Sequence, residues 1–291
     1  MKIVDNISRM STLSKMLKKE GKVIGFVPTM GYLHDGHLSL VRTAKKHTDV
    51  VVMSIFVNPL QFGPGEDFEK YPRDFKHDEE VAGSAGADIL FYPASKDIYP
   101  EGYSTYVNVE GLTDGLCGAS RPGHFRGVAT IVAKLFGIVR PDVAYFGQKD
   151  AQQAIVIKKM VEDLNMGIEI KMVPIVREKD GLAMSSRNVY LSESERRDAV
   201  VLYQSLKKAE SLVEQGERDS KKIIKAMESM IKEKSSARID YISVVNTKNL
   251  KDMNKISGEV LIALAAFVGK TRLIDNVILK VDPGQASGKK G

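Results

Sequence analysis

Short apolar runs alternate with amphipathic segments over residues 1–175 of the chain. The apolar runs are rich in β-branched residues and have the length of buried parallel strands. They span residues 23–27, 50–57, 89–92, 143–146 and 168–176. The amphipathic segments predict helices at residues 8–20, 37–47, 68–85, 126–139 and 151–164. Because strands and helices alternate strictly, the pattern predicts an α/β fold with an open, doubly wound parallel sheet.

The pattern changes after residue 176, and segment 103–116 also departs from it as an expected hairpin or loop. Two long charged helices are predicted near residues 192–216 and 219–234, followed by strands near residues 239–245, 259–267 and 271–279. Helices followed by antiparallel strands indicate a small α+β unit. We therefore predict a Rossmann-like N-terminal domain (1–175), a smaller α+β C-terminal domain (176–281) and a disordered tail (282–291). Ligands of α/β sheets bind beyond the carboxyl ends of the strands, so the second domain is expected to act as a lid.

Composition and charge narrow the class of protein. Of the 291 residues 43% are apolar, which is ordinary for a globular protein, and the single cysteine, Cys117, fits a reducing cytoplasm. The longest apolar run, residues 260–268, is far shorter than a membrane span, and no signal peptide is expected at the N-terminus. The net charge is +6, but basic and acidic residues are interleaved. A positive field that attracts anionic small molecules explains this charge as well as nucleic-acid binding does.

The strongest chemical signal follows the first apolar run. Residues 28–38, Pro-Thr-Met-Gly-Tyr-Leu-His-Asp-Gly-His-Leu, end a strand, turn at two glycines and begin a helix. A helix N-terminus presents free N–H groups and a partial positive charge, so it binds phosphate. His34 and His37 lie three residues apart there and can stabilise charge that develops on one phosphate. A histidine pair in a loop is more often structural when taken alone, and the strand–turn–helix setting is what favours catalysis.

Other uses of these residues are less well supported. No cysteine cluster or third histidine accompanies the pair at ligand spacing, so we predict no protein metal site, while Mg²⁺ carried by ATP stays open. Gly269-Lys270-Thr271 ends like a P-loop, but Leu264 stands where its first glycine is required. No complete Gly-x-Gly-x-x-Gly motif occurs, which argues against nicotinamide cofactors.

Two further segments offer phosphate-binding groups. Lys149, in the run 147–150 (Gly-Gln-Lys-Asp), follows a predicted strand and offers a point charge to a phosphate. Arg187 follows two serines in residues 181–188 (Gly-Leu-Ala-Met-Ser-Ser-Arg-Asn), a set that can grip a polyphosphate. Taken alone, the Lys149 segment is explained equally well by a capped helix start, and the Arg187 segment is better explained by an exposed turn with an N-cap serine.

Neutral and cationic groups that suit an acid substrate lie elsewhere. Asn58 and Gln61 follow the second predicted strand, where amides suit a hydroxylated substrate. Tyr71 and Arg121 stand in segments whose cations could meet a carboxylate or phosphate, and Gln153 lies one turn into the helix after residue 150. Each of these is also compatible with a polar turn or a solvated helix face.

Together the segments resemble the pantothenate synthetase (pantoate–β-alanine ligase) family, a member of the His-x-Gly-His nucleotidylyl-transferase superfamily. The resemblance covers residues 1–281, with the motifs in family order. They are Pro-Thr-Met-Gly-x-Leu-His-x-Gly-His, Phe-Val-Asn-Pro-x-Gln-Phe, Arg-Pro-Gly-His-Phe-x-Gly-Val, Phe-Gly-x-Lys-Asp-x-Gln-Gln and Gly-Leu-Ala-Met-Ser-Ser-Arg-Asn. It implies a cytoplasmic homodimer that uses ATP and Mg²⁺ to join (R)-pantoate and β-alanine through a bound pantoyl-adenylate, releasing pyrophosphate and AMP.

The resemblance also implies a division of labour among the residues. The family places His34, His37, Lys149 and Arg187 at the phosphates, with an acid role for the position of His37. The implied ATP site comprises Met30, Gly31, His34, Gly36, His37, Gly147, Lys149, Asp150, Val176, Met184, Ser185, Ser186 and Arg187. Gln61 and Gln153 would hold pantoate, and Asn58, Arg121 and Tyr71 are the further substrate-site candidates named above.

Two other interpretations stay open at this point. Another nucleotidylyl transferase of the superfamily would stop at the adenylylated product and never release AMP. A basic nucleic-acid-binding protein on an α/β scaffold would show salt-sensitive binding without nucleotide turnover. It would leave the histidine, lysine and Ser-Ser-Arg segments without a common reason.

Overall fold

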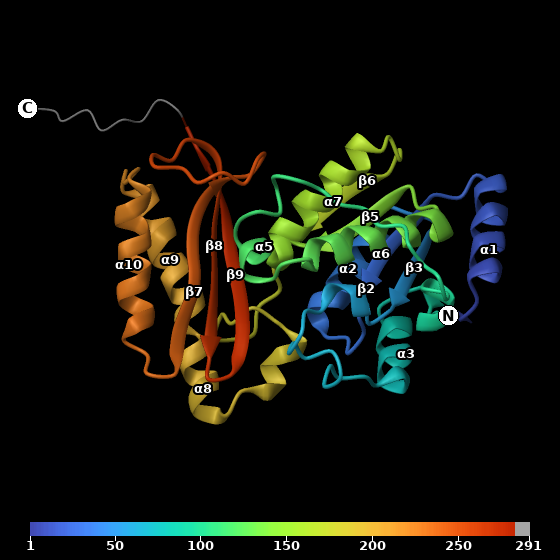
Figure 1. The fold of residues 1–291 in the computed structure, drawn as a ribbon, viewed down its shortest axis with the longest axis horizontal. Coiled ribbons are helices and arrows are strands. Elements are labelled where there is room, and N and C mark those ends of the chain that lie inside the picture. Colours follow the sequence, from blue (N-terminus) through green and yellow to red (C-terminus); the bar gives the residue numbers. More distant parts are fainter. Residues whose placement is uncertain (283–291) are drawn as a thin grey trace, which may run out of the picture. The chain divides into compact units, whose positions relative to one another are not determined.

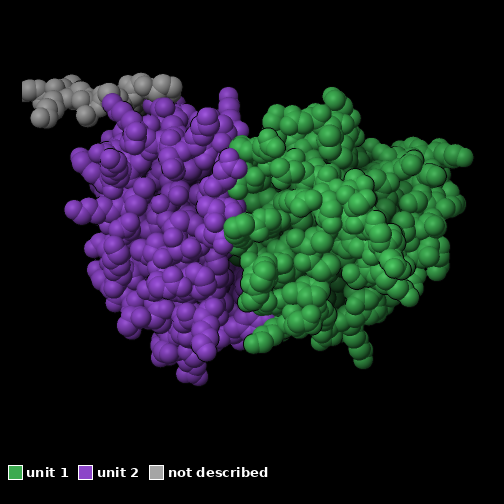
Figure 2. All heavy atoms as spheres, in the orientation of Figure 1, with its two compact units in different colours: residues 1–113, 121–176 green, residues 114–120, 177–291 purple. Residues whose placement is uncertain are grey.

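The chain forms two compact units in a computed structural model that describes residues 1–282. Unit 1 comprises residues 1–113 and 121–176, and unit 2 comprises residues 114–120 and the described residues from 177 onward (Figure 2). Segment 114–120 therefore belongs with the later half of the chain. Of the tail predicted at 282–291, all but Asp282 lies outside the described residues.

Unit 1 is a six-stranded parallel sheet with helices between its strands (Figure 1). Its strands are β1 (Lys2–Val4), β2 (Ile24–Thr29), β3 (Val50–Ile55), β4 (Ile89–Phe91), β5 (Val143–Gly147) and β6 (Glu169–Val173). Its α-helices are α1 (Ile7–Lys19), α2 (Asp35–Lys45), α3 (Phe75–Ser84), α4 (Ser95–Ile98), α6 (His124–Val139) and α7 (Ala151–Asp163). Two 3-10 turns, η1 (Pro59–Gln61) and η2 (Gln148–Asp150), follow β3 and β5.

The strand order β1-β4-β3-β2-β5-β6 creates one point where the chain changes direction across the sheet. From β2 the chain continues through β3 and β4 on one side, and it then returns to place β5 against the other side of β2. Ligands of doubly wound sheets bind at such a switch point, beyond the carboxyl ends of the strands. The segments that follow β2 and β5 lie at this point.

Helices cover both faces of the sheet because successive strand residues point to opposite sides. Val27 joins a core with Val41 of α2 and Ala82 of α3. The preceding residue, Phe26, contacts Phe136 of α6 on the other face, with ring centroids 6.2 Å apart. The doubly wound α/β prediction is confirmed.

Unit 2 is an antiparallel sheet with the order β7-β8-β9 and two long helices packed on one face. Its strands are β7 (Ala237–Asn246), β8 (Gly258–Val268) and β9 (Thr271–Val281), and its helices are α5 (Cys117–Ser120), η3 (Ser186–Tyr190), α8 (Glu193–Ala199), α9 (Val201–Glu214) and α10 (Ser220–Lys232). Leu206 of α9 and Met227 of α10 are buried in one core with Ile262 of β8. On the opposite face the Tyr241 hydroxyl lies 3.3 Å from the sulfur of Cys117.

Two expectations about individual helices need correction. The helix expected from residue 68 begins only at Phe75, because Asp74 caps it by accepting a hydrogen bond from the His77 N–H and residues 64–71 form turns and bends. The helix expected over residues 192–216 is two helices, α8 and α9, that meet at Val200. Residues 103–116, for which a hairpin or a loop was expected, contain turns and bends and no strand, so the segment is a loop. Strand β1 was not predicted, because three residues give too short a pattern.

Candidate nucleotide and acid site

The turn between β2 and α2 brings the two histidines of the motif together. His34 is the N-cap of α2, and its imidazole Nδ1 accepts a hydrogen bond from the Gly36 N–H at 3.1 Å. His37, in the first turn, accepts from the His34 N–H through its own Nδ1 at 3.4 Å. The two rings lie with centroids 4.1 Å apart and planes inclined by 35°. The sequence therefore uses histidines where serine and glutamate usually form a capping box.

These caps determine which ring nitrogens carry the proton. A nitrogen that accepts a hydrogen bond carries no proton, so in each neutral ring the proton is on Nε2. The N–H groups of His34 and Gly36, which we expected to be free for phosphate, are occupied by the histidine side chains. In both neutral rings the proton donor at the start of this helix is therefore the Nε2–H group.

The electrostatic surroundings keep His37 neutral. Burial lowers the pKa of His37 well below its ordinary value, and the neighbouring His34 and Lys149 lower it further. The influence of Lys149 also shows that the segment after β5 lies close to the segment after β2. His37 is therefore a neutral donor at pH 7, next to the positive charge of Lys149.

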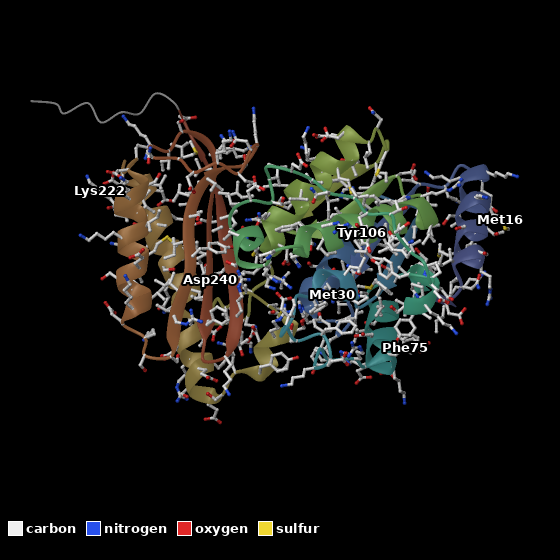
Figure 3. All side chains as sticks on the ribbon, viewed as in Figure 1. Met16, Met30, Phe75, Tyr106, Lys222 and Asp240 are labelled. Atoms are coloured by element: carbon white, nitrogen blue, oxygen red, sulfur yellow. The ribbon has the colours of Figure 1, made fainter. Side chains whose placement is uncertain are left out.

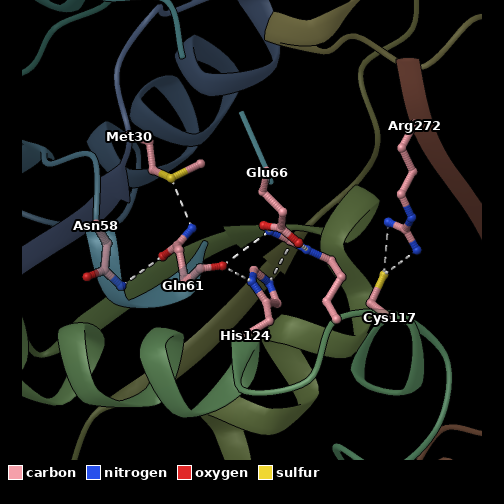
Figure 4. Close-up of polar contacts among 8 residues, drawn as sticks. Met30, Asn58, Gln61, Glu66, Cys117, His124 and Arg272 are labelled. Atoms are coloured by element: carbon pink, nitrogen blue, oxygen red, sulfur yellow. Dashed lines mark hydrogen bonds and ion pairs between the residues drawn. The ribbon is translucent and has the colours of Figure 1, made fainter. Parts of the chain in front are cut away.

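A second set of polar contacts surrounds Gln61 at the end of η1 (Figure 4). The Gln61 Nε2 donates to the Met30 sulfur at 2.9 Å, and its Oε1 accepts from the Asn58 Nδ2 at 3.0 Å. Asn58 is 1% exposed, donates to the Gly127 carbonyl at 3.1 Å, and accepts from the Tyr99 hydroxyl at 2.8 Å. The side chain of Asn58 thus bonds to protein groups, whereas the Gln61 amide donates to a thioether, which is a weak acceptor.

The backbone of Gln61 is held by a charged pair and a histidine. Arg121 forms two bonds to the Glu66 carboxylate, at 2.8 and 2.5 Å, and a third to the Gln61 carbonyl at 3.2 Å. His124 Nδ1 donates to the same carbonyl at 2.8 Å, and its Nε2 lies 3.2 Å from Arg121. Burial and the Arg121 guanidinium lower the pKa of His124 to about 4. Burial raises the pKa of Glu66, but the bonds to Arg121 outweigh it, and the pKa lies below its ordinary value.

The structure places the remaining predicted residues in both units. Gly147 ends β5, Lys149 and Asp150 form η2, and Gln153 is half-buried in the first turn of α7. Tyr71 is 4% exposed, with its ring centroid 6.0 Å from that of Phe62. Val176 is the last residue of unit 1, and the four residues Met184, Ser185, Ser186 and Arg187 belong to unit 2. There the Ser185 hydroxyl caps η3 by accepting from the Arg187 N–H.

Sequence reasoning did not single out Glu66, Tyr99 or Asp78, which support the predicted residues. Glu66 and Tyr99 bond to Arg121 and Asn58 across 55 and 41 residues of sequence. Asp78 accepts from the N–H groups of Tyr32 and Leu33. No local pattern marks these partners, because each forms its bond far along the chain.

Within residues 1–282 no group of three or more His, Cys, Asp or Glu side chains is arranged to hold a metal ion. In the same described part of the chain, no helix has both the length and the apolar character needed to cross a bilayer.

Comparison with known proteins places the whole chain in one group. The family model described as Pantoate-beta-alanine ligase matches residues 2–278. The pantothenate synthetase of Acetivibrio thermocellus is 59% identical over 281 residues, 97% of this chain and 100% of that protein. That of Caldicellulosiruptor bescii is 58% identical over 280 residues, 96% of this chain and 99% of that protein.

Solved structures agree with the sequence relatives. The crystal structure of pantothenate synthetase from Thermus thermophilus matches with a TM-score of 0.91 at 45% identity, covering 97% of this chain and 100% of that one. The pantoate-beta-alanine ligase from Francisella tularensis, complexed with beta-gamma ATP and beta-alanine, matches with a TM-score of 0.78 at 36% identity. That match covers 96% of this chain and 97% of the other.

Proposed function

The chain belongs to the pantoate–β-alanine ligase family, and from this premise we propose which of its residues carry the reaction. The enzyme condenses (R)-pantoate with β-alanine at the expense of ATP. The pantoate carboxylate attacks the ATP α-phosphorus and releases pyrophosphate, leaving enzyme-bound pantoyl-adenylate. The β-alanine amine then attacks the acyl carbon, forming the amide of pantothenate and releasing AMP.

His34 and His37 bind the phosphates of ATP in this proposal. Two Nε2–H donors at the switch point of the sheet can meet the charge that builds up on the α-phosphoryl group in the first step. The supporting observation is the pair of Nδ1 acceptor bonds, which makes Nε2–H the donor in both neutral rings. Lys149, close enough to depress the pKa of His37, adds a positive charge for the leaving pyrophosphate.

An acid role for His37 depends on the bound nucleotide. Because its pKa lies well below the ordinary value, His37 carries no extra proton to give away at pH 7. A triphosphate beside the ring would raise that pKa, since an anion favours the protonated form. In this proposal His37 acts as a neutral hydrogen-bond donor first and gains acid character only with ATP bound.

Gln61 and Gln153 bind pantoate in this proposal. The Gln61 amide donates to the Met30 sulfur, a weak acceptor, and a hydroxyl or carboxylate oxygen of the substrate would be a better one. Asn58 positions Gln61 instead of contacting the substrate, because its own groups bond to Gln61, Gly127 and Tyr99. Arg121 contributes by anchoring the Gln61 carbonyl, since Glu66 already engages its guanidinium. A direct substrate contact by Tyr71 or Arg121 stays a prediction.

The remaining ATP contacts follow from the family motifs. Met30, Gly31 and Gly36 lie in the β2–α2 turn, and Gly147 and Asp150 flank Lys149 after β5. We assign Val176 and the unit 2 residues Met184, Ser185, Ser186 and Arg187 to ATP on the motif alone. Arg187 would add a further cation for the polyphosphate. The division at residue 176 and the lid role of the second domain also stay predictions.

Three broader properties complete the proposal. The proposed phosphate-binding groups are imidazole and ammonium groups, whereas Mg²⁺ prefers oxygen ligands. Mg²⁺ would therefore be carried by the triphosphate oxygens and neutralise part of their charge. A homodimer and a cytoplasmic location follow from the family resemblance. Chelating Mg²⁺ with excess EDTA should abolish pyrophosphate release and re-adding Mg²⁺ should restore it, while sedimentation checks the oligomeric state.

The decisive experiment measures pyrophosphate and AMP release from ATP and Mg²⁺. With pantoate alone we expect about one equivalent of pyrophosphate per site, because the adenylate stays bound. Adding β-alanine should start steady AMP release. Pyrophosphate without AMP when both acids are present would instead indicate a nucleotidylyl transferase.

The residue roles are tested in the same assay. His37→Ala should slow pyrophosphate release by about 100-fold or more while the fold, followed by circular dichroism, stays intact. The exposed His47, on the surface after α2, provides the matched control, and His47→Ala should be as active as the wild type. An undiminished rate in His37→Ala would remove the phosphate role from this residue.

A further inference from the structure

The turn before His34 places a bulky residue in an unfavourable backbone conformation. Gly31 and Tyr32 have φ angles of 86° and 51°, both in the left-handed region. Glycine adopts this region freely, but a side chain with a Cβ meets the following carbonyl there. A tyrosine keeps this conformation only where the surroundings enforce it. The turn directly determines where His34, two residues later, begins helix α2.

Asp78, on helix α3, supplies the enforcing contact. Its carboxylate is 1% exposed, with Oδ2 accepting from the Tyr32 N–H at 2.8 Å and Oδ1 from the Leu33 N–H at 2.7 Å. Two successive N–H groups around a left-handed residue form a concave anion site. In this molecule the anion that fills it is a side chain of the protein. Figure 3 labels Met30, which precedes the turn, and Phe75, the first residue of α3.

A second residue of helix α3 contacts Leu33 as well. The His77 Nε2 lies 3.3 Å from the Leu33 carbonyl, so α3 holds both the N–H and the C=O of Leu33. A Cβ on Gly31 would lie 2.9 Å from the Asp78 Oδ2 and 2.9 Å from the Ile55 side chain. The glycine is therefore required both for its φ angle and for the approach of the carboxylate.

We propose that Asp78 is a positioning residue for the ATP-binding histidines. Its buried carboxylate holds the Gly31–Leu33 turn in the left-handed form and so aims the His34 and His37 Nε2–H groups at the phosphates. The inference rests on the proposed role of these histidines and adds the residue that sets their geometry. Only a carboxylate suits the site, because the two N–H groups need two acceptor oxygens.

Burial opposes this arrangement electrostatically. It raises the pKa of Asp78, while the Leu33 and Tyr32 N–H groups and the nearby His77 act in the opposite direction. A buried charge is costly unless it is well hydrogen-bonded, and a neutral side chain would avoid that cost. The presence of the acid at this position is accounted for by the turn that it holds.

Asp78→Asn is the most informative variant, because asparagine has the same shape but only one acceptor oxygen. Its NH₂ group would face one of the two N–H donors, so the turn should loosen. Misplacement of reacting groups by about 1 Å costs roughly 100-fold in rate. We expect kcat of the complete reaction, with pantoate and β-alanine both present, to fall by roughly 10- to 100-fold, with KM for ATP changing by less than about threefold.

The control separates positioning from a general weakening of α3. Asp74→Ala removes the N-cap of the same helix without touching the turn. It should lower the Tm by about 2–4 °C and leave kcat unchanged. A loss of kcat in Asp74→Ala equal to that in Asp78→Asn would show that α3 stability alone matters, and the proposal would fail.

Rescue provides the second readout. Asparagine tolerates the left-handed region better than tyrosine, so Tyr32→Asn should restore part of the kcat lost in Asp78→Asn. The double variant also takes the place of Asp78→Asn if the single variant does not fold. The two claims can fail separately. If Asp78→Asn keeps the wild-type kcat while His34→Ala and His37→Ala are inactive, only the positioning role of Asp78 is overturned. Active histidine variants would instead overturn the proposed function of the site.

Discussion

Replacing Gly127 by alanine would push helix α6 away from the turn that carries Gln61. Gly127 is buried in the first half of α6, and its carbonyl accepts from the Asn58 side chain. A Cβ at this position would lie 2.2 Å from the Leu60 carbonyl oxygen, 2.4 Å from its carbon and 2.7 Å from the Gln61 nitrogen. These are backbone atoms of η1, so no side-chain rotation relieves the contact. The helix or the turn must move.

The size of the effect follows from the contact distances. Real Cβ contacts are essentially never shorter than 3.0 Å, so the 2.2 Å contact requires a movement of at least 3.0 − 2.2 = 0.8 Å. Overpacking of this kind costs about 1–3 kcal/mol, and the better helix propensity of alanine returns about 0.5–1 kcal/mol. We expect a net loss of up to about 2.5 kcal/mol in the free energy of unfolding, seen as a Tm lower by up to roughly 10 °C. A shift near 1 Å at Gln61 should lower kcat/KM for pantoate by up to about 100-fold.

The same helix supplies the control. Gly137 is exposed near the end of α6, and a Cβ there would meet no heavy atom within 4 Å. Gly137→Ala should therefore stabilise the protein by about 0.5–1 kcal/mol and leave activity unchanged. Steady-state kinetics with varied pantoate and a thermal melt measure both variants. Wild-type kcat/KM for pantoate in Gly127→Ala would show that the position of Gln61 does not govern substrate use.

Two further predictions concern pH and a buried ion pair. The folded chain keeps His37 neutral, so the unfolded chain binds this proton first as pH falls. The contribution of neutral His37 to the free energy of unfolding is therefore fully present above about pH 6.5. Below that pH it decreases by up to about 1.4 kcal/mol per pH unit. In thermal melts from pH 7 to 5, the Tm of His37→Gln should depend less on pH than that of the wild type, whereas the exposed His47→Gln should behave as the wild type does. Equal slopes of Tm against pH in all three proteins would contradict this. In unit 2, Asp275 is 2% exposed and pairs with Arg177 at 2.6 and 2.9 Å, so Asp275→Ala should cost about 3 kcal/mol in urea unfolding. Glu162→Ala, at an exposed ion pair, should cost less than about 0.5 kcal/mol, and a similar loss for both would refute the role of burial.

Local pattern was sufficient for most of the secondary structure, because burial on a sheet or helix leaves a periodic trace in the sequence. The five apolar runs before residue 176 correspond to β2, β3, β4, β5 and β6. Errors arose where the pattern was short or crossed a break. Strand β1 has three residues, and α8 and α9 meet at Val200 without a proline or glycine to mark the boundary.

The chemistry of the site was visible for a similar reason. His34 and His37 are three residues apart, so one turn of helix brings their rings together whatever the rest of the chain does. The histidine motif and Lys149 could be recognised as strand-end residues from their flanking sequence. Their mutual proximity required the strand order, in which β5 lies beside β2.

The sequence by itself thus determined the α/β class, the family and the His-x-Gly-His motif, because each rests on patterns of residues close together along the chain. Tertiary structure alone decided that Asp78 holds the turn before His34 and that Glu66 engages Arg121. It also decided that Gly127 must lack a side chain, since the Leu60 carbonyl occupies that space. These contacts join residues 45 to 67 positions apart, and no periodicity or local propensity records which distant groups a close-packed interior brings together.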